Sequence, residues 1–235
     1  VTGQNGPVLE GLAPYVLDGT VASVLLVVLD DPGPGLLVLP ANSPGVRIGH
    51  RDLMDLRNWA CVEFTGVPVP DTVPGGSEPA LDRALDEMTV ALTAEMLGGM
   101  WTLFDLTLEH ARTRTQFGRP IGGFQALQHR LARLYGDLLL TDACVREAAE
   151  ALDGDLLEAP ALASAAKLRC VASSRLVCRE SVQLHGGMGV TDECDVGLYV
   201  KNLRVAEFFL GDPTWHADRW ASPAAPIHDT GEVKR

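Results

Sequence analysis

The sequence lacks long apolar runs and is poor in positive charge. Its longest apolar stretch, residues 21–29, contains a serine and falls far short of the ~20 residues that cross a bilayer. The N-terminus has no basic start followed by an apolar stretch, so no secretory signal is expected. The 235 residues carry 19 Lys and Arg against 31 Asp and Glu, a net charge of −12. An acidic surface repels nucleic-acid phosphates and anionic lipid, so neither nucleic-acid binding nor a membrane span is expected.

Paired cysteine motifs are also missing. The five cysteines, an odd number, include no CxxC pair, which disfavours both a disulfide framework and a zinc site. No cluster of His, Asp and Glu has the spacing of metal ligands. Cys170 and Cys178 are expected to be small core side chains. We therefore expect no metal and a reducing, cytoplasmic setting.

Residues 1–76 have the texture of a β domain, because they are rich in Val, Gly and Pro. Apolar, β-branched segments over residues 21–30, 35–40 and 60–69 predict strands. Residues 31–34, Asp-Pro-Gly-Pro, are typical of a turn between the first two. The pattern predicts part of an antiparallel sheet.

The sequence pattern of residues 77–221 predicts helices. Ser77, Glu78 and Pro79 are typical of a helix start, and apolar residues recur at helical spacing as far as Arg114. Further helices are predicted over residues 124–152, 159–184 and 195–209, followed by a short one that Asp212 caps. We therefore expect an α+β fold, a partial antiparallel β domain followed by an antiparallel helical bundle, with a tail over 222–235.

Two loop motifs could bind a ligand. The first, residues 112–121, reads RTRTQFGRPI, and the second, residues 183–191, reads QLHGGMGVT. A guanidinium beside an aromatic ring can hold a phosphate and cover a ring, and adjacent glycines let a ligand approach the backbone. Each feature alone is more typical of an ordinary helix end.

Together, the motifs resemble the C-terminal bundle of the acyl-CoA dehydrogenases. The resemblance covers most of the chain and lacks the family's N-terminal helical domain. It implies FAD as cofactor and α,β-desaturation of an acyl-CoA, in which a carboxylate removes the α-proton and the β-hydrogen leaves as hydride. It also implies a homo- or hetero-oligomer with another such chain, an electron-transfer acceptor, and contacts with a neighbouring subunit's FAD from Arg114, Gln116, Phe117, Gln183, Gly186 and Gly187.

The resemblance fails at the positions that carry the chemistry. Leu210 occupies the position of the family's usual base, and leucine cannot abstract a proton. The position of the alternative base, on the first long helix, is Met88. Its neighbour Glu87 points about 100° away around the helix and is typical of a solvated carboxylate.

Three further positions depart from the family pattern. Thr89 stands where the resemblance expects an active-site arginine, and Pro7 and Leu9 stand where it expects an aromatic residue and a hydroxyl beside the flavin. Glu95 lies in mid-helix, and Glu193 is expected to have a structural role near a helix start. His216, in a first helical turn, is expected at the surface.

Four hypotheses follow. In the leading one, the chain is the non-catalytic member of a heteromeric acyl-CoA dehydrogenase and lends the six contact residues to FAD held mainly by its partner. Alternatively, it is a complete dehydrogenase with a non-standard base such as Glu87, a flavin-free binding subunit, or a piece of a longer protein.

Overall fold

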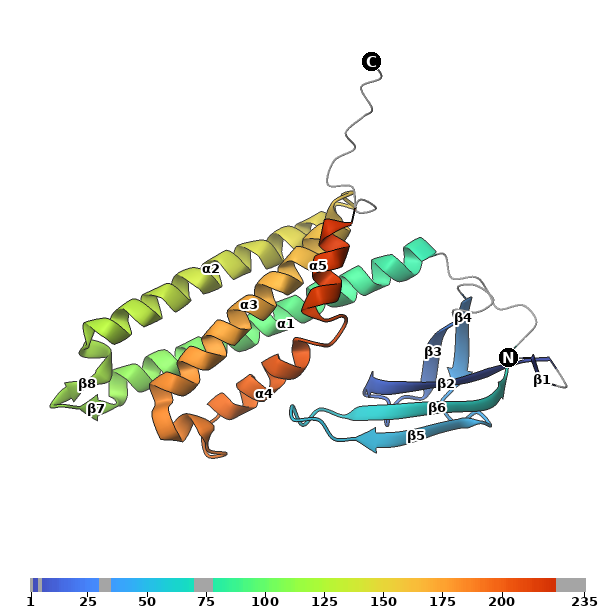
Figure 1. Ribbon diagram of the computed structural model, residues 1–235, viewed down its shortest axis with the longest axis horizontal. Helices are drawn as coiled ribbons and strands as arrows, with labels where there is room; N and C mark the ends of the chain where they lie inside the picture. Colours follow the sequence, from blue (N-terminus) through green and yellow to red (C-terminus); the bar gives the residue numbers. More distant parts are fainter. Residues whose placement is uncertain (1, 4–5, 30–34, 70–77, 223–235) are drawn as a thin grey trace, which may run out of the picture. The chain divides into compact units, whose positions relative to one another are not determined.

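The computed structural model describes residues 2–3, 6–29, 35–69 and 78–222. The chain forms two compact units, residues 1–82 and 83–235, and Figure 1 shows strands in the first and long helices in the second. The predicted domain boundary at 76–77 lies outside the described residues.

The first unit is an antiparallel β structure. A four-stranded sheet has the order β1-β2-β6-β5, and a separate ribbon pairs β3 with β4. The strands are β1 (Thr2–Gly3), β2 (Gly6–Leu17), β3 (Val24–Leu29), β4 (Gly35–Pro40), β5 (Val46–Arg51) and β6 (Trp59–Pro68). The predictions for β3, β4 and β6 are confirmed to within three residues, whereas β2 and β5 were not predicted. The predicted turn over 31–34 lies outside the described residues.

Side chains of alternating direction build the core of this unit. Leu25 of β3, Leu37 and Leu39 of β4 and Val62 and Phe64 of β6 are all buried together. The other face of the ribbon is apolar as well, and it is exposed at Val24, Leu26, Val28 and Val38. Both faces of the ribbon are therefore apolar, which explains why its strands read as continuous apolar runs rather than alternating ones.

The second unit is a helical bundle. Its helices are α1 (Glu78–Thr113), α2 (Gln125–Asp153), α3 (Ala159–His185), α4 (Val196–Ala206) and α5 (Pro213–Ala221). The first three run side by side, and α4 and α5 pack beside α3 (Figure 1). The predicted α1, α2 and α3 are confirmed to within one residue, whereas α4 ends three residues earlier than predicted. Within the described part of the chain, no helix is long and apolar enough to cross a bilayer.

Local signals set several helix ends. Asp212 caps α5, since its Oδ1 accepts a hydrogen bond from the backbone N of Trp215 at 2.8 Å, and Pro213 takes the first position. Gly154 follows α2 and Gly186, with φ 63°, follows α3. The capping residues therefore specify these ends as the sequence predicted.

Polar contacts inside the bundle join α2 to α3. The hydroxyls of Thr141 and Ser173 lie 2.7 Å apart in the core. One turn away, Arg169 Nη2 donates to Asp137 Oδ1 at 2.6 Å and to the Asp137 carbonyl at 3.0 Å. Around them, the buried apolar side chains of all three long helices form one core. The apolar core provides burial, and these polar pairs fix how the two helices align.

Candidate cofactor and reaction site

A small hairpin follows the end of α1. Arg114 donates its backbone N–H to the His110 carbonyl at 2.9 Å and accepts from the backbone N of Ile121 at 2.8 Å. In between, β7 (Thr115–Gln116) pairs with β8 (Arg119–Pro120). The two turn residues, Phe117 and Gly118, have φ of 52° and 80°. Positive φ at both central residues is the pattern of a type I′ hairpin.

The turn presents Phe117 to solvent. A bulky side chain rarely adopts positive φ, yet Phe117 does so while its side chain is 92% exposed. Its ring meets Phe124 edge to face at 6.1 Å, and the Arg119 guanidinium lies 4.1 Å from the centre of the same Phe124 ring. Strain of this kind gathers at functional sites. The backbone of Arg114 and Gln116 places both side chains in solvent on the same hairpin.

A hollow of about 410 Å³ adjoins the hairpin. Gln128, at the start of α2, donates from Nε2 to the Gly122 carbonyl at 3.0 Å on its rim. The lining comes from the end of α1, the hairpin and the first turns of α2, and consists of Leu108, Ala111, Arg112, Pro120, Gly122, Gln128 and Leu131. Its surface is mostly apolar with one cation, Arg112.

The glycine motif forms a 3₁₀ turn, η2 (Gly186–Val190), at the end of α3. Gly186 has φ 63° and ψ −140°, a conformation that only glycine adopts readily, and it caps the helix through its N–H. Gly186 and Gly187 are exposed, and no atom lies within 4 Å of a Cβ added to either. Gln183 is exposed as well. The loop therefore offers open backbone and an amide side chain.

Two histidines connect the motifs. The rings of His110 and His185 stack at 4.4 Å with 25° between their planes. His185 Nδ1 lies 2.9 Å from the Ser181 carbonyl, which fixes that ring. Burial lowers the pKa of His110, and the neighbouring His185 and Arg114 lower it further. The structure therefore brings together the ends of α1 and α3, from which the hairpin and the glycine turn extend.

The segment after α4 holds Leu210 firmly. Leu210 has φ 58°, is half-buried and packs against the bundle core. The next residue, Gly211, has φ 101°, and a Cβ there would lie 2.5 Å from the Trp215 ring. His216 Nε2 lies 3.0 Å from the Leu210 carbonyl. An aliphatic side chain thus occupies a well-defined place in this turn.

The surface position predicted for His216 is wrong, because α5 packs against α3 and buries it completely. Its Nδ1 lies 3.3 Å from Ser164 Oγ of α3. Burial lowers its pKa to about 4, so the ring is neutral at pH 7. The neutral ring can donate its Nε2 proton to the Leu210 carbonyl and thereby fixes the turn.

Lys167 is a second anchor, which was not predicted from the sequence. Its side chain is fully buried, and Nζ donates to the carbonyls of Ala206 at 2.5 Å and Phe209 at 2.8 Å. Burial lowers the pKa of Lys167 to about 8. The sequence feature that could have indicated this role is a single lysine within the Ala-rich segment of α3. Lys167 therefore binds the carbonyl of the last residue of α4, Ala206, and that of Phe209 in the segment after it.

Glu87, the weak candidate for a base, lies on the exposed surface of α1. Its Oε1 accepts from Arg83 Nε at 2.7 Å, and Arg83 also contacts Asp155 Oδ1 at 2.7 Å. Met88 is exposed and Thr89 is buried in the bundle. This arrangement matches the solvated carboxylate expected of Glu87 and gives it a structural partner.

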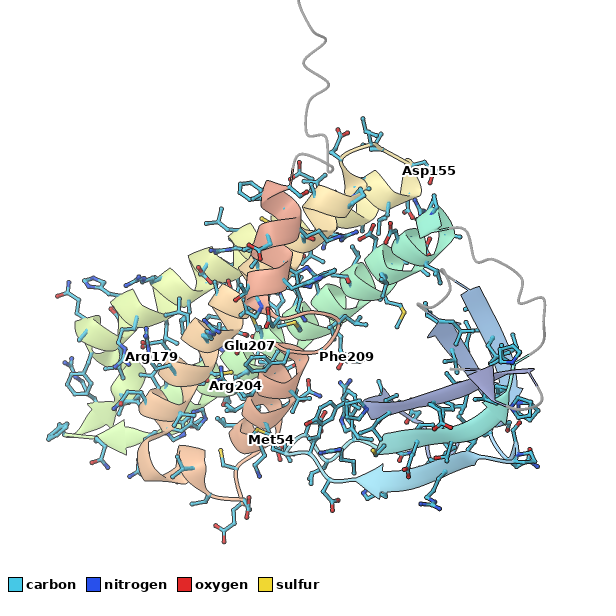
Figure 2. All side chains as sticks on the ribbon, turned by 45° about the vertical axis from the view of Figure 1, so that its right-hand side comes forward. Met54, Asp155, Arg179, Arg204, Glu207 and Phe209 are labelled. Atoms are coloured by element: carbon cyan, nitrogen blue, oxygen red, sulfur yellow. The ribbon has the colours of Figure 1, made fainter. Side chains whose placement is uncertain are left out.

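The buried carboxylate just before Leu210 is Glu207, which was not predicted either. Its Oε1 accepts from Arg175 and its Oε2 from Arg204 Nη1 at 2.5 Å. Figure 2 shows Glu207 and Arg204 together at the end of α4. Both carboxylate oxygens of Glu207 are therefore already engaged in ion pairs with guanidiniums. No sequence signal identified it, because Arg175 lies on another helix.

The other residues singled out in the sequence lie outside the hairpin, the glycine turn and the Leu210 turn. Pro7 and Leu9 lie on β2, where Pro7 is exposed and Leu9 packs against the β core. Glu95 is exposed on α1, and Glu193 is exposed shortly before α4. Among the described residues, no group of three or more His, Cys, Asp or Glu side chains could hold a metal ion.

Comparisons with known proteins agree with this architecture. Residues 76–221 match the profile of the acyl-CoA dehydrogenase C-terminal domain. The acyl-CoA dehydrogenase IpdE2 of Mycobacterium tuberculosis is 38% identical over 145 residues, which are 59% of this chain and 43% of IpdE2. FadE27 of the same organism is 33% identical over 219 residues, 89% of this chain and 58% of FadE27.

Solved structures show the same fold. The ChsE4-ChsE5 complex of Mycobacterium tuberculosis contains a chain that is 30% identical, with a TM-score of 0.82 over 90% of this chain and 58% of that one. Glutaryl-CoA dehydrogenase of Mycobacterium smegmatis is 28% identical, with a TM-score of 0.81 over 91% of this chain and 57% of that one. This chain spans about half the length of the curated relatives it matches. Since the profile covers more than half of the chain, the chain belongs to the acyl-CoA dehydrogenase family.

Proposed function

We propose that this chain is the non-catalytic subunit of a heteromeric acyl-CoA dehydrogenase. It binds a second acyl-CoA dehydrogenase chain, lends residues to an FAD held mainly by that chain, and leaves the base to it. The observation that carries this proposal is Leu210, an aliphatic side chain held by His216 and the bundle core at the position where the family resemblance expects a carboxylate.

The exposed residues at the cofactor end fit FAD. A diphosphate needs cations and open backbone, and Arg114 and the Gly186–Gly187 turn present both to solvent. An adenine ring needs an exposed aromatic surface, which Phe117 offers at the hairpin tip. Gln116 and Gln183 add amide groups that can donate or accept. In this proposal these six residues would bind and orient the cofactor, and FAD, when bound, would supply the acceptor for the hydride.

Two observations favour a mixed assembly. The side chains that fit FAD are exposed and can reach a neighbouring chain, whereas Leu210 cannot serve as a base and Glu87 is paired with Arg83. The ChsE4-ChsE5 structure, 30% identical in the matched chain, is itself a complex. We therefore propose an acyl-CoA substrate, an external electron-transfer acceptor and a hetero-oligomer. We also propose the cytoplasm as its compartment, because the five cysteines are free thiols.

The test is the visible spectrum of the chain purified alone and after co-expression with a neighbouring dehydrogenase gene product. We expect a flavin spectrum only in the complex, and we expect Arg114→Ala to reduce the flavin content. Arg146→Ala, on the exposed side of α2, is the matched control. An unchanged flavin content in Arg114→Ala would favour the flavin-free binding subunit. A flavin spectrum from the chain alone, bleached by acyl-CoA, would show a complete enzyme and overturn the proposal.

A further inference from the structure

Two guanidiniums share one buried carboxylate on the face formed by α3 and α4. The side chain of Glu207 is 1% exposed, whereas those of Arg175 and Arg204 are 55% and 53% exposed. Arg175 comes from the middle of α3 and Arg204 from the last turn of α4. The three charges sum to +1 on a chain whose net charge is −12, so this is a local cationic site on an acidic protein.

Neutralising Glu207 does not use all the capacity of this cluster. One guanidinium would balance one carboxylate, yet two are present. Each contacts Glu207 through a single terminal nitrogen, Arg175 Nη2 and Arg204 Nη1. An arginine carries five N–H donors, so both half-exposed forks keep donors that solvent can reach.

Further contacts support Arg204 and Glu207 within the cluster. Arg204 is fixed from a second side by Phe208, with 5.4 Å between its guanidinium and the ring centre. Glu207 is fixed in the turn that Lys167 anchors through the Ala206 carbonyl. Ordering long side chains in advance lowers the entropy that a ligand must overcome. Two guanidiniums that share one buried carboxylate are thus partly ordered before an anion that can bridge them arrives.

The neighbouring residues extend the positive potential toward the glycine turn. Arg179 follows Arg175 by one helical turn, and its side chain is 70% exposed. Its contact with Glu180 is long, at 3.4 Å, whereas Arg130 binds that carboxylate at 2.5 Å. Gln183 lies one further turn along the same face of α3. Figure 2 shows Arg179 on α3 and Arg204 on the adjacent α4.

We propose that Arg175 and Arg204, supported by the buried Glu207, form a binding site for the phosphate group of an organic phosphate. Phosphate accepts paired hydrogen bonds from guanidinium forks in the geometry that these side chains offer. The ligand class includes both the phosphates of coenzyme A and the diphosphate of FAD. Arg175 and Arg204 are not among the residues to which we assign FAD, and the binding of a phosphate to them does not depend on that assignment.

Calorimetric titration of the full chain with pyrophosphate at about 0.1 M ionic strength, where the Debye length is about 10 Å, tests the site. We expect Arg175→Gln and Arg204→Gln each to weaken binding roughly tenfold or more, the effect of losing a charge-assisted hydrogen bond. Arg146→Gln removes the same charge from α2 and should change the affinity less than about twofold, because distant charges are screened. Parallel titrations with coenzyme A and with FAD then identify which of them is the source of the phosphate.

A double variant separates fork geometry from net charge. Arg175→Gln combined with Glu207→Gln keeps the cluster at +1 and leaves no buried carboxylate short of a partner, so it also remains testable if a single variant misfolds. We expect it still to bind pyrophosphate more weakly than the unmodified chain. Equal affinity in the double variant, or no pyrophosphate binding by the unmodified chain, would overturn the proposal. If Arg175→Gln instead abolished only co-purification with a partner chain, the cluster would be a protein interface, and the phosphate site would be rejected.

Discussion

His216 Nε2 lies 3.0 Å from the carbonyl oxygen of Leu210, and the histidine is completely buried between α5 and α3. The bond connects a titratable group directly to the turn in which the family resemblance places the base. Burial lowers the pKa of His216 to about 4 although the hydrogen bond to Leu210 acts in the opposite direction, so the burial of His216 makes the stability of the helical unit depend on pH.

The sign of that dependence follows from proton linkage. Below pH 6.5 the unfolded chain binds a proton at His216 that the folded chain refuses until about pH 4, so stability falls as the pH drops through this window and then levels off. At about 1.4 kcal/mol per pKa unit, the loss is on the order of 3 kcal/mol. Urea unfolding of His216→Gln between pH 7 and 4 should show a shallower decline. His129→Gln, at an exposed histidine of α2, should keep the original slope, and equal slopes in both variants would contradict the prediction.

Leu210→Glu should not create a dehydrogenase. The new carboxylate would enter a half-buried site with positive φ, and Thr89 would still point into the bundle core. We expect no bleaching of added flavin when this variant is mixed with a panel of acyl-CoAs. Measurable turnover by the single variant would show that the rest of the site is already prepared for catalysis.

Phe117→Asn should separate stability from cofactor binding. Asparagine tolerates positive φ better than phenylalanine, whereas the edge-to-face contact with Phe124 is lost, so the free energy of unfolding should stay within about 1 kcal/mol of the original. The flavin content of the co-purified complex should fall. Leu56→Asn is the matched control, since Leu56 is 77% exposed with φ 59° in the other unit. Equal flavin content in both variants would remove Phe117 from the cofactor site.

Two glycines of one turn should respond differently to alanine. A methyl group added at Gly187 would lie in open space, so Gly187→Ala should keep its stability and lower the flavin content, because the methyl would meet an approaching cofactor. At Gly189 the added Cβ would lie 3.0 Å from the Val182 carbonyl and from His185 Cβ. Gly189→Ala should therefore unfold at lower temperature, typically costing about 1–3 kcal/mol. Thermal unfolding and flavin absorbance together measure both effects, and a reversed order would refute this view of the turn.

The thiols of Cys170 and Cys178 should react slowly. Burial raises the pKa of each to about 12, and the thiolate is the reactive form. In native labelling with a thiol reagent at pH 8, followed by peptide mass spectrometry, both should lag behind Cys61, Cys144 and Cys194. Labelling in urea should make the five rates similar. Early modification of Cys170 would mean that the bundle core opens readily.

Local patterns in the sequence predicted most of the bundle. The long apolar periodicity and the caps at Asp212, Gly154 and Gly186 act within a few residues, so the bounds of α1, α2 and α3 could be inferred closely. The end of α4 could not be inferred in this way, because the carbonyls of Ala206 and Phe209 bind Lys167, which is more than thirty residues away in the chain. Strand β5 was missed because only two of its residues, VRIGHR, are large and apolar, and they pair with β6 only in the folded sheet.

Contacts between distant segments explain the rest of the site. The burial of His216 required the packing of α5 on α3, which no nearby residue indicates. The ring stack of His110 and His185 spans 75 positions and likewise has no local signature. The Glu207 cluster combines residues of two helices, each of which alone reads as an ordinary surface charge. By contrast, the hairpin and glycine motifs are contiguous, so their residues could be named from the sequence, and their roles stay predictions.

The pairs Thr141–Ser173 and Asp137–Arg169 fix the position of α2 along α3. Sliding one helix past the other by a single turn, about 5.4 Å, would break both pairs at once. The length of the turn over 154–158 therefore does not determine how α2 and α3 align. Extra residues in that turn would bulge outward and leave the opposite end of the helix pair in place. The chain can change length at that turn while the hairpin before α2 and the glycine turn after α3 keep their separation.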